Sequence, residues 1–167
     1  MDLSQEMLNA SGSRNWDRLR ELVLSLFQSV EYRKPTLRGF VQIIRVSDTR
    51  TRISALHIIK LYGRVFGAYE ASESSELEET LISAYRNDFP IEKLSELKNY
   101  DRDRSRDIPA GAGLELLWLN GLVFAFLDLK LARGYAAIEE VLVMFEDAPL
   151  GRMIRKELRE ERVRGHP

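Results

Sequence analysis

Hydrophobic residues recur at helical spacing along most of this chain. From residue 15 to residue 31, the apolar positions share one side of a helical projection and the charged positions share the other. The apolar positions are Trp16, Leu19, Leu22, Val23, Leu26, Phe27 and Val30. A period near 3.6 residues is that of an amphipathic α-helix, so this stretch predicts a helix.

The same period, read together with start and stop residues, predicts further helices. Thr36 is suited to cap a second helix, with Pro35 in the connection before it. Asp48 or Thr49 is suited to cap a third helix. Ser75 begins a capping-box pattern that is completed three residues later, and Pro149 is expected to end the helix before it. The expected helices cover residues 15–31, 37–46, 49–66, 76–87, 90–97, 114–131 and 135–146.

The stretch from residue 114 to residue 131 differs from the others because it is apolar on nearly every side. A helix without a wide polar face is normally surrounded by other helices. The pattern therefore predicts an all-α, single-domain helical bundle in which this helix is central. The alternative is that one side of this helix is a partner groove or a self-association seam, with Trp118, Leu122 and Phe126 as its contact residues.

Composition divides the chain into three parts. Residues 1–12 contain no long apolar run and are expected to form an N-terminal tail. Residues 13–148 form the helical domain, and within it a charged connection over about residues 99–113 is expected to be mobile because charges of both signs precede several glycines. Residues 149–167 form a charged C-terminal segment that is expected to dock briefly as a helix and then fray.

Composition also restricts the possible chemistry. The chain has 167 residues, no cysteine and two histidines, so thiol nucleophiles, disulfides and Cys-ligated metals are excluded. His57 has basic neighbours on its expected helix rather than an orienting carboxylate, and His166 lies at the chain end. We therefore expect a protein that is not an enzyme, with no metal, no cofactor and no small-molecule substrate.

The distribution of charge is the one departure from a neutral background. The chain has 25 basic and 26 acidic residues, but residues 33–64 hold eight basic residues against Asp48 alone, a local charge of +7. Seven-residue steps place these cations in stripes on the second and third expected helices. If those helices form a hairpin, the stripes merge into one anion-binding face. Its expected members are Arg38, Arg45, Arg50, His57, Lys60 and Arg64.

The sequence supports three hypotheses, two for this face and one for the apolar helix over residues 114–131. The preferred hypothesis is a non-enzymatic binding protein that contacts a phosphate-bearing polyanion, either nucleic acid or an acidic membrane surface. The second is a solvated face whose charges pair with the acidic residues 70–79 or with a neighbouring helix. The third is a protein-interaction or self-assembling scaffold that uses the apolar helix, as a homo-oligomer or with another protein. Without an apparent export signal, we expect an intracellular protein, soluble or peripherally associated with a membrane.

Overall fold

The computed structural model describes residues 2–27, 29–66, 71–99 and 112–163. Within these ranges the chain is helical and contains no strand, which confirms the all-α prediction. The elements are α1 (Leu3–Gly12), α2 (Trp16–Phe27), α3 (Val30–Val46), α4 (Thr49–Phe66), α5 (Ala71–Asp88), α6 (Ile91–Lys98), α7 (Ala112–Asp128), the short 3-10 helix η1 (Ala132–Gly134), α8 (Tyr135–Met144) and α9 (Pro149–Val163).

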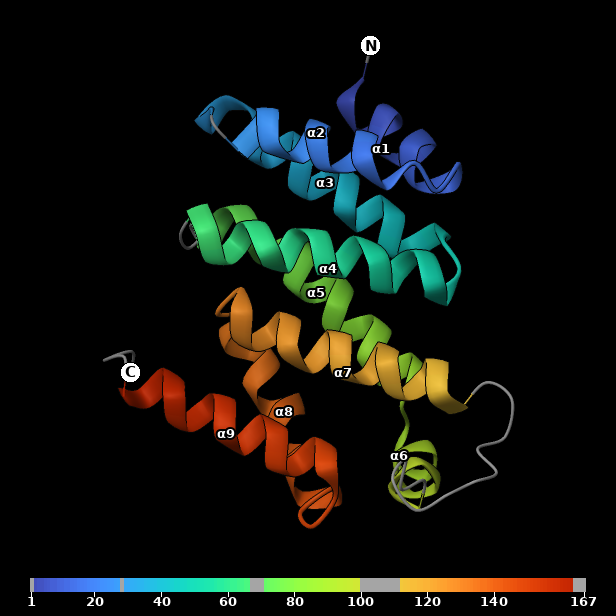
Figure 1. The fold of residues 1–167 in the computed structure, drawn as a ribbon, viewed down its shortest axis with the longest axis vertical. Helices are drawn as coiled ribbons and strands as arrows, with labels where there is room; N and C mark the ends of the chain where they lie inside the picture. Colours follow the sequence, from blue (N-terminus) through green and yellow to red (C-terminus); the bar gives the residue numbers. More distant parts are fainter. Residues whose placement is uncertain (1, 28, 67–70, 100–111, 164–167) are drawn as a thin grey trace.

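The helices are stacked in two rows along the long axis of the molecule (Figure 1). One row holds α2, α4, α7 and α9, and the row behind it holds α3, α5 and α8. Within the rows, contacts are most extensive between α3 and α5 and between α4 and α7. Each helix therefore covers the apolar side of its neighbours in the stack, as in quasi-one-dimensional helical proteins.

The first element corrects the expected N-terminal tail, because residues 3–12 form α1. Asp2 caps this helix by accepting a hydrogen bond from the Ser4 backbone N–H at 3.1 Å. Met7 is fully buried against α3 at Gly39, where a Cβ atom would collide with the methionine sulfur. The small residue at position 39 thus lets α1 approach α3 closely, which the composition of residues 1–12 alone does not reveal.

The second expected helix begins earlier than predicted. Pro35 lies inside α3 rather than in a connection; as the sixth residue of the helix it lacks the N–H that would donate to the Glu31 carbonyl oxygen, so α3 forms one hydrogen bond fewer there. Thr36 is not an N-cap: it is buried, and its hydroxyl donates to the Tyr32 carbonyl oxygen at 2.8 Å. The helix predicted over residues 15–31 is correspondingly split, since α2 ends at Phe27.

The start of α4 agrees with the prediction. The Asp48 carboxylate accepts a hydrogen bond from the Thr51 backbone N–H at 2.8 Å, as an N-cap does. This bond lowers the pKa of Asp48 below its ordinary value, with further lowering from the charge of Arg14. The next helix, α5, begins at Ala71, so Ser75 lies within it rather than at its cap.

The C-terminal part departs from the prediction at one proline. Pro149 begins α9 instead of ending α8, which closes at Met144. Gly151 sits in the first turn of α9, where a Cβ atom would collide with the Phe145 carbonyl oxygen. Ile154 is fully buried, α9 contacts α7 and α8, and the helix extends to Val163, whose side chain is exposed. Of the connection expected to be mobile, residues 100–111 lie outside the described part of the chain.

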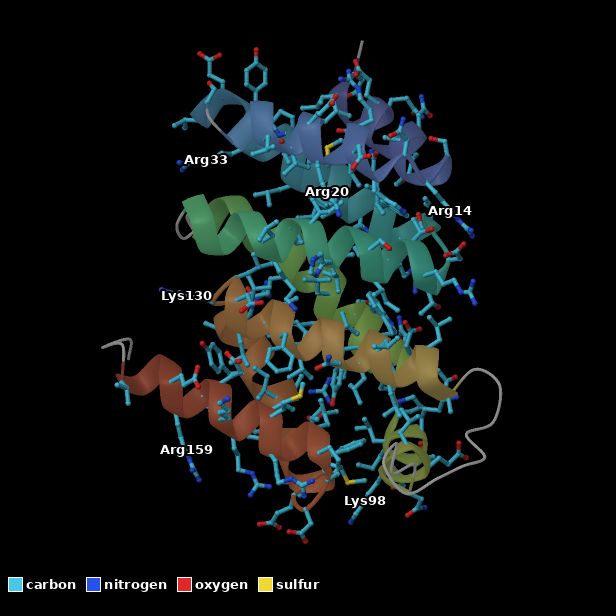
Figure 2. All side chains as sticks on the ribbon, viewed as in Figure 1. Arg14, Arg20, Arg33, Lys98, Lys130 and Arg159 are labelled. Carbon is cyan, nitrogen blue, oxygen red and sulfur yellow. The ribbon has the colours of Figure 1, made fainter. Side chains whose placement is uncertain are left out.

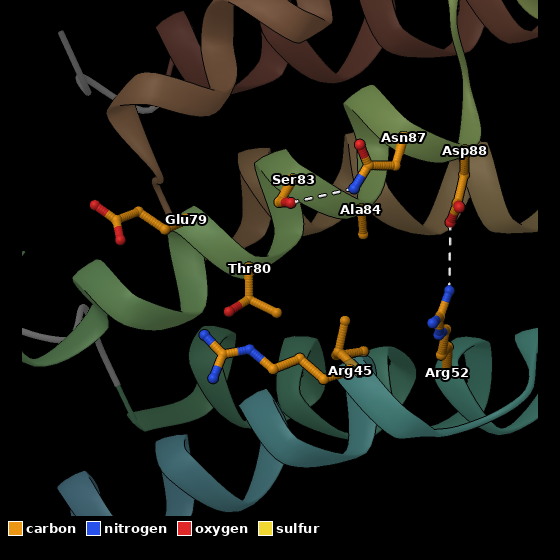
Figure 3. Close-up of a pocket in the computed structure, with 9 residues that line it drawn as sticks. Arg45, Arg52, Glu79, Thr80, Ser83, Ala84, Asn87 and Asp88 are labelled. Atoms are coloured by element: carbon orange, nitrogen blue, oxygen red, sulfur yellow. Dashed lines mark hydrogen bonds and ion pairs between the residues drawn. The ribbon is translucent and has the colours of Figure 1, made fainter.

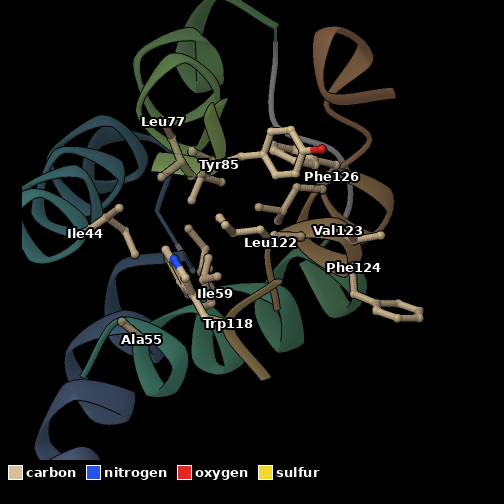
Figure 4. Packing of buried hydrophobic residues seen from close by; sticks show 14 of the residues in the cluster. Ile44, Ala55, Ile59, Leu77, Tyr85, Trp118, Leu122, Val123, Phe124 and Phe126 are labelled. Carbon is tan, nitrogen blue, oxygen red and sulfur yellow. The ribbon is translucent and has the colours of Figure 1, made fainter. Parts of the chain in front are cut away.

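The core runs through both rows and includes most of α7 (Figure 4). Trp118, Leu122 and Phe126 are 2%, 0% and 0% exposed, so they are interior residues and not a surface seam. The main contacts of α7 are with α4, α5, α8 and α9, whereas α1 and α2 pack chiefly on α3 and α4. A bundle arranged around α7 is therefore not confirmed; α7 is one layer of the stack.

No helix in the described ranges combines the length and the apolar character needed to cross a membrane.

Candidate anion-binding groove

The predicted cationic residues do not form one face. Arg38 and Arg45 are exposed on α3 and lie beside α5. Lys60 of α4 instead contacts α7, where its ammonium lies 3.5 Å from the Asp128 carboxylate. Arg50 and His57 are exposed and form no ion pair with another described residue. The side chain of Arg64 lies outside the described residues.

Helical geometry explains why the stripes stay apart. Arg52 of α4 reaches the hollow between α3 and α5. At about 100° per residue, Arg50 lies about 200° and His57 about 140° around the helix from Arg52. These two side chains therefore face away from the hollow, on the side of α4 opposite α3 and α5. Other cations, such as Lys130 and Arg159, lie at the periphery of the molecule (Figure 2).

Between α3 and α5 lies a groove with two hollows. The larger hollow has a volume of about 400 Å³ (Figure 3). One side carries Arg45 and Arg52, and the α5 side carries Glu79 and Asp88 at its two ends. The remaining lining residues are Ile44, Thr80, Ser83, Ala84 and Asn87. Arg45 extends toward Thr80 in this view, while Arg52 points to Asp88 at the other end.

The smaller hollow continues the same groove toward the start of α3. It has a volume of about 210 Å³ and is lined by Lys34, Leu37, Arg38, Val41, Ser75, Glu76 and Leu77. Glu76 stands between the two hollows because its carboxylate pairs with the Arg45 guanidinium at 3.4 Å. The α3–α5 groove, as we call the two hollows together, therefore has a cationic edge from α3 and α4 and a polar edge from α5.

Arg52 is held in the groove by more contacts than Arg45. The Arg45 and Glu76 side chains are 55% and 51% exposed, so water screens their ion pair. Arg52 is only 21% exposed and pairs with Asp88 at 3.3 Å. Its guanidinium also lies 5.8 Å from the centre of the Trp118 ring, and Asp88 accepts a hydrogen bond from the Trp118 indole N–H at 2.9 Å. Arg52 is thus fixed in place, whereas Arg45 can exchange its partner.

Two of the three carboxylates in the groove are engaged by groups other than Arg45. Glu79 pairs with Arg133 of η1 at 3.2 Å, and Asp88 is held by Arg52 and Trp118. The hydrogen bonds from Arg133 to Glu78 and Glu79 raise the pKa of Arg133, so this cation stays charged. The acidic wall is therefore largely neutralised by its own neighbours.

The α5 edge also offers neutral hydrogen-bonding groups. The Ser83 hydroxyl accepts from the Asn87 amide at 3.4 Å, which leaves the hydroxyl proton and the second amide proton of Asn87 available as donors. The Thr80 hydroxyl donates to the Glu76 carbonyl oxygen at 2.8 Å and retains its accepting capacity. Together with the guanidinium groups, the Ser83 and Asn87 donors can bind a carboxylate or a phosphate oxygen.

Sequence reasoning identified Arg38 and Arg45 but missed Arg52, Lys34 and the α5 edge. A signal for Arg52 does exist, because it continues the seven-residue step from Arg38 through Arg45. That step crosses the turn between α3 and α4, so the helical period alone could not place it. In the described part of the chain, no group of three or more metal-ligating side chains could hold an ion.

Comparisons of this chain with protein-family models, with curated proteins and with solved structures find no match.

Proposed function

We propose that this chain is a non-enzymatic binding protein that engages an anionic partner along the α3–α5 groove. The observation that supports the proposal is the row of cations formed by Arg38, Arg45 and Arg52 beside hydroxyl and amide donors of α5. Guanidinium groups suit this task because they bind carboxylate and phosphate oxygens with two parallel hydrogen bonds.

An incoming anion replaces the internal partner of a cation at a lower cost in free energy in this groove than at Lys60. An exposed ion pair such as Arg45–Glu76 stabilises a protein by only about 0–1 kcal/mol, so an incoming anion can replace Glu76 at little cost. Lys60 is a poorer candidate because its partner Asp128 has a side chain only 6% exposed. Removing the cation from such a carboxylate leaves a buried charge uncompensated.

The scaffold alternative receives less support. It requires Trp118, Leu122 and Phe126 to face a partner, and all three belong to the core. Self-association through these residues would therefore have to open the stack. An oligomer formed through some other surface is a separate hypothesis, and light scattering tests it directly.

The proposal is tested by measuring the affinity for three anionic probes at several salt concentrations. The probes are a short single-stranded RNA, phosphatidylserine-containing vesicles and polyglutamate. Wild-type protein is expected to bind at least one probe, with affinity falling steeply as salt rises, because bound counterions are released. The double variant Arg38→Glu, Arg45→Glu is expected to lose at least about tenfold in affinity, equivalent to about 1.4 kcal/mol.

The matched control carries the same change in net charge outside the groove. Arg20→Glu with Arg50→Glu alters two exposed arginines, one on α2 and one on the outward side of α4. This control is expected to keep most of the affinity. If neither double variant changes the binding, or if both change it equally, the groove is not the site.

A further inference from the structure

We infer that the α3–α5 groove receives an extended acidic peptide segment of a partner protein. This inference rests on the proposed function and names the chemical class of the partner. Charge complementarity favours such an occupant, since the groove carries Lys34, Arg38, Arg45 and Arg52 against Glu76, Glu79 and Asp88. Because Glu79 is also held by Arg133, which lies outside the groove lining, the groove has cationic capacity left for a ligand.

The lining of the groove argues against single-stranded nucleic acid. Proteins that bind single strands combine a cationic channel with aromatic side chains on which the bases stack. Neither hollow has an aromatic residue in its lining. The shape also argues against a membrane, because hollows of about 210 and 400 Å³ accept groups the size of side chains rather than a flat surface. A peptide needs no aromatic side chains for stacking, and its own side chains are of the size that these hollows accept.

The spacing of the cations sets a register for the peptide. Arg38 and Arg45 are seven residues apart on one helix, which is about 10.5 Å along its axis. A polyproline II segment repeats every three residues, or about 9.3 Å, and places those residues on one side. In a β-strand, residues three apart point to opposite sides. The best match is a polyproline II segment with an acidic residue at every third position.

The two edges of the groove divide the recognition between them. Arg38 and Arg45 would each pair with one acidic side chain of the peptide. On the α5 edge, Ser83 and Asn87 can donate to backbone carbonyl groups, which an extended peptide leaves without internal partners. Ile44 and Ala84 provide an apolar lining beneath the small residues between the acids.

The experiment uses short fluorescent peptides and the full chain. One peptide carries glutamate at every third position among alanine and proline. A second peptide has the same composition but carries all its glutamates in one block. Fluorescence anisotropy at low salt is expected to show at least about tenfold tighter binding of the spaced peptide than of the block peptide.

Two variants test the groove without relying on charge reversal. Ser83→Trp fills the larger hollow at an exposed position with no change of charge, and it is expected to abolish binding of the spaced peptide. Glu76→Gln removes the internal competitor for Arg45 and is expected to tighten binding severalfold. Thermal melting of each variant establishes that it is folded.

The outcomes separate the inference from the proposed function. Tight binding of the spaced peptide that Ser83→Trp abolishes supports both. Binding of RNA or vesicles through Arg38 and Arg45, with no binding of either peptide, overturns the inference and leaves the proposed function standing. Equal binding of the spaced and block peptides overturns the expected spacing of one acidic residue at every third position. Absence of binding to all probes overturns both.

Discussion

The α3–α5 and α4–α7 contacts have the same helix arrangement, but the first leaves an open groove and the second is filled by side chains. Each joins successive helices of one row (Figure 1). Between α4 and α7, apolar side chains such as Leu56 and Trp118 fill the contact, and a Cβ atom on Gly121 would lie 3.5 Å from Leu56. Between α3 and α5, the inner side is equally apolar, with Ile44 and Leu77 buried, but the outer side is a polar groove.

Residue type at the outer edge, rather than helix arrangement, decides whether the space between two helices is filled. On α7 nearly every side is apolar, so both flanks can be packed. On α3 and α5 the outer positions carry long charged side chains, which keep their charged ends in water instead of filling space. A hollow is therefore left above the apolar base, and charged and polar side chains line its walls.

The largest effect expected from this comparison is on stability. Trp118→Ala should lower the free energy of unfolding by about 3–5 kcal/mol, because it leaves a cavity in the α4–α7 contact. Ser83→Ala in the α3–α5 groove should change it by less than about 0.5 kcal/mol. Urea denaturation of the two variants measures both values, and similar losses would show that the groove is packed like the core.

The buried side of α5 provides the next prediction, which concerns alkaline pH. Burial raises the pKa of Tyr85 well above its ordinary value of 10, and the charge of Glu140 raises it further. The unfolded chain therefore loses this proton before the folded chain does, so the free energy of unfolding should fall as pH rises above about 10. This component should be absent from Tyr85→Phe.

The same variant has a smaller effect at neutral pH. The Tyr85 hydroxyl donates to Glu140 at 3.2 Å, and its loss should cost about 1 kcal/mol. Glu140 keeps its ion pair with Arg86 at 2.6 Å, which limits the loss of stability. Tyr32→Phe, at an exposed position, is the control. An alkaline loss of stability that is equal in wild type and Tyr85→Phe would contradict the assignment.

A substitution at Gly121, in the α4–α7 contact, should raise stability rather than lower it. Gly121→Ala places its methyl group in ordinary contact with Leu56 and removes the helix penalty of glycine, so the protein should gain up to about 1 kcal/mol. Gly151→Ala should destabilise the fold, because its methyl group would collide with the Phe145 carbonyl. Thermal melting distinguishes the two, and a loss at Gly121 would mean that α4 and α7 are more tightly packed than described.

The smallest expected effect is on the stability of the groove itself. Glu76→Gln breaks an exposed ion pair with Arg45, so the free energy of unfolding should change by only about 0–1 kcal/mol. A larger loss in urea denaturation would make this pair part of the framework rather than a replaceable contact.

Much of the secondary structure could be predicted from local pattern. The body of α2, the cap at Asp48 and the short helix after Pro90 follow from helical period and from start residues. The helix α1 has a local start signal in the Asp2 cap, but its close packing on α3 depends on Gly39 of that other helix. Pro149 was likewise ambiguous, because proline both ends one helix and begins the next.

The candidate site was predictable only in part for the same reason. The period placed Arg38 and Arg45 on one stripe, which is a property of a single helix. Which neighbour that stripe faces depends on α5, about thirty residues further along the chain. Arg50 and His57 obey the same period, yet they face away from the α3–α5 groove because they lie about 200° and 140° around α4 from Arg52.

The helical character of the chain and the gathering of cations between residues 33 and 64 are local properties of residue type and spacing, so both could be predicted before the fold was known. Which cations meet, which are neutralised and where Trp118 lies depend on how the helices pack. The physical reason is that a helical period fixes the direction of a side chain around its own axis, whereas its surroundings are fixed by helices distant in the sequence.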